Sequence, residues 1–404
     1  MRYLQLLLLT LLAHTAMYAA GFSVDKEWYV AGEQIDVEID LSDKLSRVAY
    51  VELSDAAGVQ TGTLAEIRKG RGRVALILPR SLHSGYYRLA VYTRVTAPLC
   101  MDVAVVNTLR STADDKIVWQ ETEGKTQAFG AQNKGIYTLE SKEMADYLGL
   151  ETSGHTIVAR LKEPHAEVTS VLSIVGKQVH VFGGKQVGDS ILLFHTYGLE
   201  GKHQVVASAY TVDGKSLPLE IVSPYAAYLP DSLPVLHLNY SRKEVESRSI
   251  DMQKMALERT DTVTPLPYDE AIFSVQPVLH YDLDEYRQFA TIGDTFVEYV
   301  NLVHHSERNG FHELFVYNNA EGYSNWPAMV LIDGMPTNDI KRLLKYDARR
   351  VHFINLYNDW FTLGSNSIHK GIVSFVTRGG NITNFPPDKG SAYIVYDFPK
   401  QNRY

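Results

Sequence analysis

The chain has 404 residues, of which 45% are hydrophobic and 21% are charged, a composition typical of a folded globular protein. Its formal net charge is −8 and it lacks the clustered basic residues of a nucleic-acid-binding face, so we expect no nucleic-acid partner. The single cysteine, Cys100, excludes an intramolecular disulfide framework and a cysteine-rich zinc or iron–sulfur site.

The first 20 residues have the pattern of a secretory signal peptide. Arg2 is followed by an apolar run over residues 4–12, and small residues lead to Ala20. The apolar run is shorter than the ~20 residues that a membrane-spanning helix needs. We therefore predict that residues 1–20 are a signal peptide and that the protein is exported; an N-terminal core helix or anchor is the alternative.

Residues 22–107 carry a β pattern throughout. Apolar and acidic residues alternate over residues 35–41, which predicts a half-buried strand. Residues 48–53, 72–78 and 86–95 are further strand-length apolar segments, and turn residues separate them. Short strands at this spacing favour an antiparallel β-sandwich.

A second β block is expected over residues 116–222. Its clearest strand patterns are those of residues 155–161, 168–175, 188–196 and 204–212. Turn residues at Gly183-Gly184 and Asp213-Gly214 separate or follow these strands. A short helix is expected over residues 141–148, with Ser141 as its N-cap. We predict a second sandwich of about the same size.

Residues 223–281 are predicted to form a linker, because prolines interrupt any regular element. Between these prolines lies a charged stretch in which Val245, Met252 and Met255 share one helical face. Its poor periodicity favours a solvated linker or a weak helix laid across a neighbouring domain.

The last block, residues 282–404, mixes helix and strand and is predicted to be a compact α+β module. Asp294 is the expected N-cap of one helix, and Thr337 or Asn338 of another. Strands are expected over residues 311–317, 328–332, 351–356 and 371–377. The whole chain is therefore predicted to be mainly β, with two antiparallel sandwiches followed by this small module.

Two stretches resemble known families. The segment Tyr29-Val30-Ala31-Gly32-Glu33 and the strand Ser84-Gly85-Tyr86-Tyr87-Arg88-Leu89 are similar to the opening and closing strands of alpha-2-macroglobulin-type sandwiches. The pattern Met329-Val330-Leu331-Ile332-Asp333-Gly334-Met335-Pro336, followed by a helix, a strand, Gly364 and the strand of residues 371–377, resembles the plug domain of TonB-dependent outer-membrane receptors.

The combination resembles a family of exported Bacteroidetes cell-envelope proteins. The 24 residues after Gly380 are too few for a receptor barrel. The resemblance therefore implies a fold and a location in the periplasm or at the outer membrane, but not the transport activity of the receptors.

A macroglobulin protease trap carries a thioester between a cysteine and a glutamine. The context Pro98-Leu99-Cys100-Met101-Asp102 lacks the Gly-Glu-Gln sequence of that bond. We therefore interpret Cys100 as a buried structural thiol.

The candidate metal ligands are His304, His305, His312 and Glu313. The spacing His-Glu-x-x-His of zincins is not met, because Val316 occupies the position of the second histidine. The adjacent His304 and His305 are expected at the C-terminal end of the first helix of the α+β module, where they point in different directions. We predict no metal site and no cofactor.

Other catalytic patterns are weak. No Gly-x-Ser-x-Gly elbow occurs, and Ser365 lies in the glycine loop of the plug-like pattern. The stretch Gly183-Gly184-Lys185-Gln186 lacks the serine or threonine that follows the lysine of a phosphate-binding loop. The acidic residues that could serve glycoside hydrolysis are Asp282, Asp284 and Glu285. We favour a solvated helix start for them.

Aromatic residues are abundant, with 25 tyrosines, 14 phenylalanines and 4 tryptophans. Those that cluster in the plug-like region are Tyr323, Trp326, Tyr357, Trp360 and Phe361. They either fill a small core or form a recognition surface.

The favoured function is a non-enzymatic, exported envelope protein that acts as a binding or scaffold module. Its expected partner is an outer-membrane or periplasmic protein. The alternatives are a carbohydrate-binding protein and a hydrolase whose catalytic groups converge from distant loops.

Overall fold

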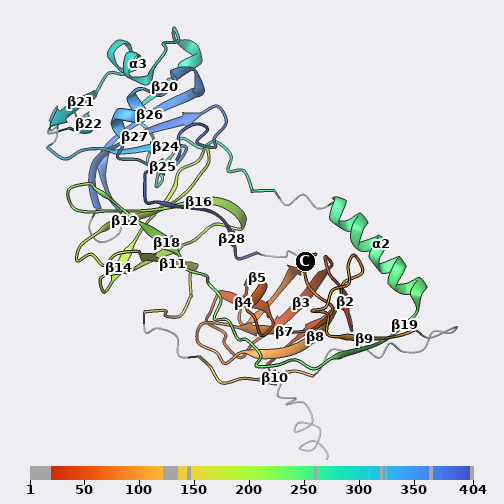
Figure 1. The fold of residues 1–404 in the computed structure, drawn as a ribbon. Helices are drawn as coiled ribbons and strands as arrows, with labels where there is room; N and C mark the ends of the chain where they lie inside the picture. Colours follow the sequence, from red (N-terminus) through yellow and green to blue (C-terminus); the bar gives the residue numbers. More distant parts are fainter. Residues whose placement is uncertain are drawn as a thin grey trace, which may run out of the picture. The chain divides into compact units, whose positions relative to one another are not determined.

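The computed structural model describes residues 20–121, 135–142, 147–258, 262–308, 310–318, 322–323, 325–363 and 367–400. Residues 1–19 of the predicted signal peptide, residues 143–146 of the predicted helix, and Ser365 lie outside this part. The described chain is mainly β, as predicted. It divides into two compact units: unit 1 is residues 1–152, 225–260 and 400–404, and unit 2 is residues 153–224 and 261–399 (Figure 1). The predicted five-part division of the chain stays a prediction.

The elements of unit 1 are β1 (Gly21–Val24), β2 (Tyr29–Val30), β3 (Gln34–Asp40), β4 (Val48–Ser54), β5 (Val59–Glu66), β6 (Arg71–Ile77), β7 (Gly85–Tyr92), β8 (Leu99–Val106), β9 (Ile117–Glu121), β10 (Tyr137–Thr138), β19 (Leu236–Tyr240) and α2 (Arg242–Glu258).

The elements of unit 2 are β11 (His155–Leu161), β12 (Thr169–Ile174), β13 (His180–Gly183), β14 (Lys185–Val187), β15 (Ile191–Thr196), β16 (Gly201–Tyr210), β17 (Ser216–Leu217), β18 (Leu219–Ile221), β20 (Leu279–Asp282), η1 (Leu283–Glu285), α3 (Ile292–Glu298), β21 (Val303–Arg308), β22 (Phe311–Asn318), β23 (Gly322–Tyr323), β24 (Met329–Ile332), β25 (Met335–Pro336), α4 (Ile340–Leu344), η2 (Ala348–Arg350), β26 (Val351–Leu363), β27 (Ser367–Thr377) and β28 (Ala392–Phe398).

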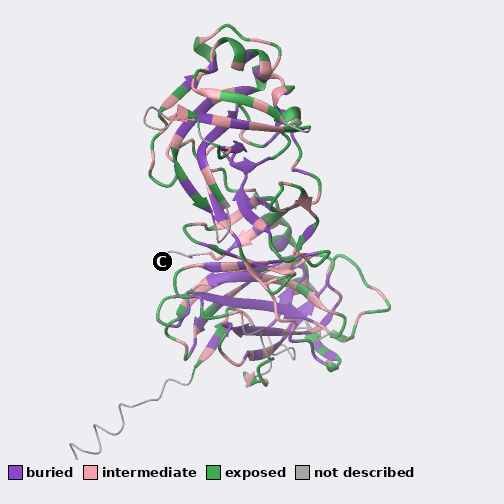
Figure 2. Cartoon of the chain, turned by 90° about the vertical axis from the view of Figure 1, so that its left-hand side faces the viewer, coloured by how far each residue is buried: buried purple, intermediate pink, exposed green. Residues whose placement is uncertain are grey.

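Unit 1 is built around a β-sandwich. A sheet with the order β1-β3-β6 faces a sheet with the order β10-β8-β7-β4-β5, in which β2 also pairs with β8. Ile35, Val37 and Ile39 of β3 are buried while the residues between them are not, as the alternating sequence predicted. They share one core with Val51 and Leu89 of the facing sheet. Figure 2 shows the buried stretches following the strands.

The segment expected to be a linker contains two regular elements of unit 1. Strand β19 pairs in parallel with β9, and helix α2 follows it. Of the three residues expected on one helical face, Met252 is buried, Val245 packs partly buried beside it, and Met255 is 47% exposed. Residues 242–258 therefore form a helix laid on the sandwich, the second of the two expected alternatives, and not a solvated linker.

Helix α2 is held on the sandwich by a cation–π contact, an ion pair and a close approach to the backbone. The guanidinium of Arg248 lies 3.7 Å from the ring centroid of Trp28, and its Nη2 donates to the Glu33 carboxylate at 2.7 Å. Gly32 has φ +100°, and a Cβ there would lie 2.8 Å from the sulfur of Met252. Only glycine suits this position, because its backbone is left-handed and the helix packs directly on it.

Among the described residues, unit 2 has a small sheet, β21-β22-β23, and a stack of three larger sheets. Their orders are β14-β15-β11-β18, β13-β12-β16-β17 with β28 beside β16, and β20-β26-β27-β24-β25. On one side of the middle sheet, Val171 and Tyr210 are buried in one cluster with Leu331 of the third sheet. On the other side, Nε2 of His155 in β11 lies 2.6 Å from the hydroxyl oxygen of Tyr396 in β28. The middle sheet is therefore covered on both faces, and its edge is extended by the last strand of the chain.

Helix α3 begins earlier than the sequence suggested. Thr291, not Asp294, is the N-cap, since its hydroxyl accepts a hydrogen bond from the Asp294 amide at 3.2 Å. The helix ends at Glu298, so His304 and His305 lie in strand β21 and not at a helix end. The prediction of a longer helix that ends at these histidines was therefore wrong.

Helix α4 is capped by Asp339 and not by Thr337 or Asn338. Its carboxylate accepts a hydrogen bond from the Arg342 amide at 3.0 Å. The two expected caps are instead bound to Asp388, which is 7% exposed. The four groups that donate to the Asp388 carboxylate are Oγ1 of Thr337 at 2.7 Å, the amide of Asn338 at 2.8 Å, Nη2 of Arg342 at 3.1 Å and the hydroxyl of Tyr210 at 3.3 Å. Asp388 thus joins α4 to the middle sheet.

We expect Asp388→Ala to lower the free energy of unfolding of unit 2 by about 2–4 kcal/mol, because it leaves the partly exposed guanidinium of Arg342 and the buried hydroxyl groups of Thr337 and Tyr210 without their acceptor. The matched control is Asp339→Ala, which removes an exposed N-cap of the same helix and an exposed ion pair with Arg342 and should cost about 1 kcal/mol. Urea unfolding followed by tryptophan fluorescence measures both. Equal losses in the two variants would contradict the assigned role of Asp388.

Candidate binding surfaces

Two half-exposed tryptophans lie against each other on unit 2. Trp326 precedes β24 and is 51% exposed, and Trp360 lies in β26 and is 48% exposed. Their ring centroids are 6.4 Å apart at an interplanar angle of 69°, the edge-to-face arrangement that aromatic rings favour. The ammonium nitrogen of Lys370 lies 4.7 Å from the ring centroid of Trp360. We call Trp326 and Trp360 the tryptophan pair.

Strands β26 and β27 position this pair. Their register shifts between Tyr357 and Trp360, a bulge that re-aims the side chains that follow it. Gly371 lies opposite the bulge with φ +94°, and a Cβ there would come within 2.7 Å of the Tyr357 carbonyl oxygen. His369 of β27 hydrogen-bonds to the backbone of Pro327, in the loop that carries the other tryptophan. Strand β27 therefore positions both tryptophans, because it pairs with the strand that carries Trp360 and hydrogen-bonds to the loop that carries Trp326.

The remaining aromatic candidates separate into core and surface. Tyr357 and Phe361 are buried in the cluster between the middle and third sheets. Tyr323 is 51% exposed, and its ring centroid lies 5.7 Å from that of His304. The core interpretation is therefore confirmed for Tyr357 and Phe361, while a recognition surface stays a prediction for the exposed members.

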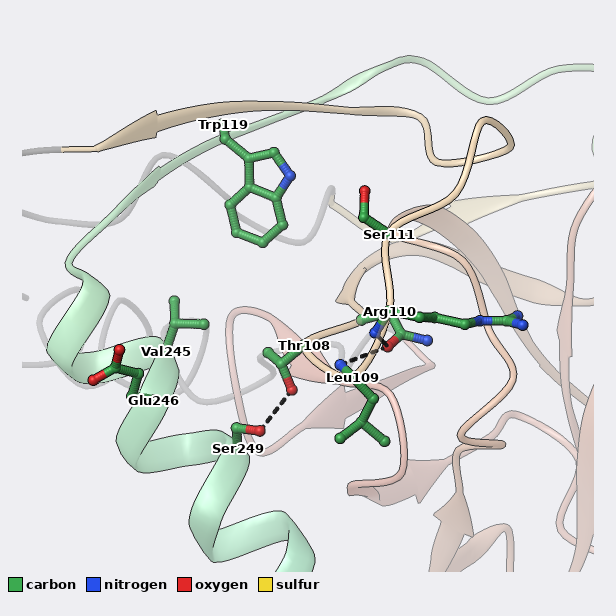
Figure 3. A pocket seen from close by; sticks show the side chains of 9 residues that line it. Thr108, Leu109, Arg110, Ser111, Trp119, Val245, Glu246 and Ser249 are labelled. Atoms are coloured by element: carbon green, nitrogen blue, oxygen red, sulfur yellow. Dashed lines mark hydrogen bonds between the residues drawn. The ribbon is translucent and has the colours of Figure 1, made fainter.

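Unit 1 carries a hollow of about 560 Å³ that no sequence pattern indicated (Figure 3). Its walls are the loop after β8, Trp119 of β9 and the first turns of α2. Trp119 is 40% exposed, and Oγ1 of Thr108 lies 2.7 Å from Oγ of Ser249, which joins the loop to the helix. Figure 3 shows the side chain of Arg110 pointing away from Trp119. An indole and the hydroxyl groups of Thr108, Ser111 and Ser249 therefore line this hollow.

Asp282 and Asp284 form an ion network with His352. The Nε2 atom of His352 lies 3.6 Å from an oxygen of Asp282 and 3.4 Å from one of Asp284. Arg378 donates to both oxygens of Asp284, at 3.0 and 2.5 Å, and this lowers the pKa of Asp284. A cation would have to displace Arg378, and a carboxyl group with a lowered pKa is poorly suited to be a general acid. We interpret the network as a surface ion cluster, of which Glu285 is not a member.

The four histidine and glutamate candidates fall on two faces of the hairpin formed by β21 and β22. His305 lies opposite Leu314, and His312 lies opposite Glu307. Residues directly opposite in a ladder share a face and neighbours along a strand alternate, so His305 and His312 share the face of buried Leu314. His304 and Glu313 lie on the other face. Sequence spacing did not indicate this division, because it depends on the pairing register.

The nucleophile and phosphate-loop candidates are packing positions. Cys100 is fully buried in β8, and burial raises the pKa of its thiol to about 12, so it stays protonated near neutral pH. Gly183 is the last residue of β13, and Gly184 separates it from β14, which belongs to another sheet. A Cβ on Gly184 would come within 2.8 Å of the Phe194 ring.

Among the described residues, no helix has both the length and the apolar character that crossing a membrane requires. No protein-family model matches the sequence, and no curated protein matches it. Two solved structures show a distant likeness. One is the BSP domain of a biofilm-associated protein, at 10% identity and a TM-score of 0.18, with 55% of this chain and 30% of that chain covered.

The other is a candidate adhesin from Bacteroides ovatus ATCC 8483, at 14% identity and a TM-score of 0.13, with 56% of this chain and 92% of that chain covered. The chain thus spans less than a third of the biofilm-associated protein. Superpositions at these TM-scores establish no common fold.

We expect the Cys100 thiol to resist a thiol reagent such as DTNB at pH 8 in the native protein and to react fully in 6 M guanidinium, because it is buried and protonated. Absorbance at 412 nm measures the reaction. The matched control is the double variant Cys100→Ser, Val212→Cys, which moves the cysteine to a position that is 82% exposed. Its thiol should react at once in the native protein. Stoichiometric native labelling of Cys100 would contradict its structural role.

Proposed function

We propose that this protein is a non-enzymatic binding module of the cell envelope that docks to another envelope protein through the tryptophan pair. The observation that carries the proposal is the half-exposed, edge-to-face arrangement of Trp326 and Trp360. Tryptophan is the residue type most enriched among the energetic anchors of protein interfaces.

The core of unit 2 does not need these two indoles. Tyr357 and Phe361 of the same region are buried and fill the space against the middle sheet. The tryptophan pair lies outside this cluster and leaves about half of each side chain exposed to solvent. Large apolar side chains kept at a surface in contact with each other favour an interaction site.

The envelope location rests on the signal-peptide pattern of residues 1–20 and on the resemblance to a receptor plug. The resemblance is supported by the order of elements, since β24 is followed by the turn at Asp333-Gly334, then by α4, β26 and β27. Asp333 has φ +46°, and its carboxylate accepts hydrogen bonds from the amides of Thr377 and Ile382. This turn therefore fixes the end of β27 and the loop after it.

A binding role also agrees with the state of the candidate catalytic groups. The Cys100 thiol is buried, and Asp284 is held in its ionised form by Arg378. The acidic pair needed for glycoside hydrolysis would require one carboxyl group with a raised pKa. The pKa of Asp284 is lowered instead.

We expect Trp326→Ala and Trp360→Ala each to weaken partner binding by about 2 kcal/mol or more, the cost typical of an interface anchor. The measurement is photo-cross-linking in envelope extracts. A benzophenone amino acid replaces Ile368 of β27, a residue that is 48% exposed. Mass spectrometry identifies the captured protein, and titration with the purified partner gives the affinities.

The matched control is Val297→Ala on α3, a position that is 84% exposed and outside the tryptophan pair. It should leave capture unchanged. Recovery of the tagged protein alone at monomer mass, or capture by both tryptophan variants at the level of the wild-type chain, would overturn the docking proposal.

A second candidate function is carbohydrate binding, which the hollow of unit 1 favours. A sugar ring presents an apolar face that stacks on an indole and a rim of hydroxyl groups that hydrogen-bond to polar side chains. Trp119 supplies the indole, and Thr108, Ser111 and Ser249 supply hydroxyl groups around it (Figure 3).

We expect that, if the hollow binds glycans, Trp119→Ala removes binding on a glycan array, because the stacking surface is lost. Trp326→Ala and Trp360→Ala are the controls and should keep it, since both residues belong to the other unit. Loss of glycan binding in the controls would instead make the tryptophan pair the sugar site, and binding in none of the proteins would remove this candidate function.

A further inference from the structure

We propose that the hairpin of β21 and β22 holds a divalent transition-metal ion between Nε2 of His305 and Nδ1 of His312. The ion is of the class that prefers imidazole nitrogen, namely Cu²⁺, Ni²⁺ or Zn²⁺. Water molecules complete its coordination. The inference is independent of the proposed docking function.

The two imidazoles are already brought together. Nε2 of His305 lies 2.9 Å from Nδ1 of His312, and the two ring planes are within 1° of parallel. Metal–imidazole bonds are about 2.0–2.1 Å long, so two neighbouring ligands at a right angle are separated by about 2.9 Å. Small side-chain rotations are enough to direct both nitrogens at one ion.

A carboxylate lies near the outer nitrogen of the His312 ring, at a distance longer than a hydrogen bond. Oε1 of Glu307 lies 3.7 Å from Nε2 of His312, the nitrogen that faces away from His305. A carboxylate beside one imidazole nitrogen favours the proton there and leaves the other nitrogen as the ligand, as in many metal sites. His305 then donates its Nε2 proton to His312 in the metal-free protein and carries it on Nδ1 when the ion binds.

The protein holds these groups at the end of an ordered strand pair. Val303, opposite Val316, and His305, opposite Leu314, lie on the face that packs into the core of unit 2. His312 follows on the same face, with a side chain that is 11% exposed. The core beneath the hairpin therefore restricts the ring of His312, while the ring of His305 is exposed and held by the strand backbone and by its contact with His312.

The other acidic and histidine cluster, around Asp284, is filled by Arg378.

The test is calorimetric titration of the full chain, carrying no polyhistidine tag, with CuCl₂, NiCl₂ or ZnCl₂ alone. We expect one tightest site, weakened tenfold or more by His305→Ala and by His312→Ala. Glu307→Gln should weaken it less than tenfold, because it removes only the negative charge near Nε2 of His312. Circular dichroism shows whether each variant is folded.

His304→Ala is the matched control, since the neighbouring residue lies on the other face of the same strand, and it should leave the affinity unchanged. A second readout is the electron paramagnetic resonance spectrum of bound Cu²⁺, which should show two equatorial nitrogens in the wild-type chain and fewer in His312→Ala. Unchanged affinity in His305→Ala and His312→Ala, or loss of the site in His352→Ala instead, would overturn the proposal.

Discussion

The middle sheet of unit 2 is the constraint on which the rest of that unit depends. Successive residues of β12 and β16 are buried on opposite faces: Leu172 and Val205 face the first sheet, while Val171 and Val206 face the third. A sheet with two apolar faces is stable in water only when both are covered. The first and third sheets are therefore parts of one folded unit, and the third sheet holds the tryptophan pair and supports the hairpin with the two histidines.

This constraint explains why the exposed aromatic residues can serve recognition. The third sheet buries Tyr357 and Phe361 against the middle sheet, so its stability comes from that face. Trp360 follows a bulge in the same strand and stays half exposed. Loss of an exposed indole costs little packing, whereas loss of a buried ring leaves a cavity. Binding and folding can therefore be separated by substitution at neighbouring positions of one strand.

The strands could be predicted from the sequence, whereas the helices that pack on them and the helix caps were predicted less well. The alternation of Ile35, Val37 and Ile39 is a local signal, and the structure confirms it. Helix α2 was predicted poorly, because its support comes from Trp28 and Gly32, more than 200 residues away in the chain. The caps of α4 were misplaced for a related reason, since the side chains expected to cap it bind the distant Asp388. The hollow beside Trp119 depends on the same long-range contacts and has no sequence signature.

In the hairpin of β21 and β22, the pairing register decides which side chains meet, and the composition alone does not. The sequence offers four possible ligands, and only the pairing of His305 with Leu314 and of His312 with Glu307 decides which two meet. A slip of one residue would move each histidine to the opposite face. The same alternation places His304 on the other face, where its ring lies 5.7 Å from that of Tyr323. One face of this strand pair thus carries the nitrogen atoms of His305 and His312, and the other face carries the aromatic surface. Substitution of His304 therefore alters the aromatic face and leaves the two nitrogen ligands in place.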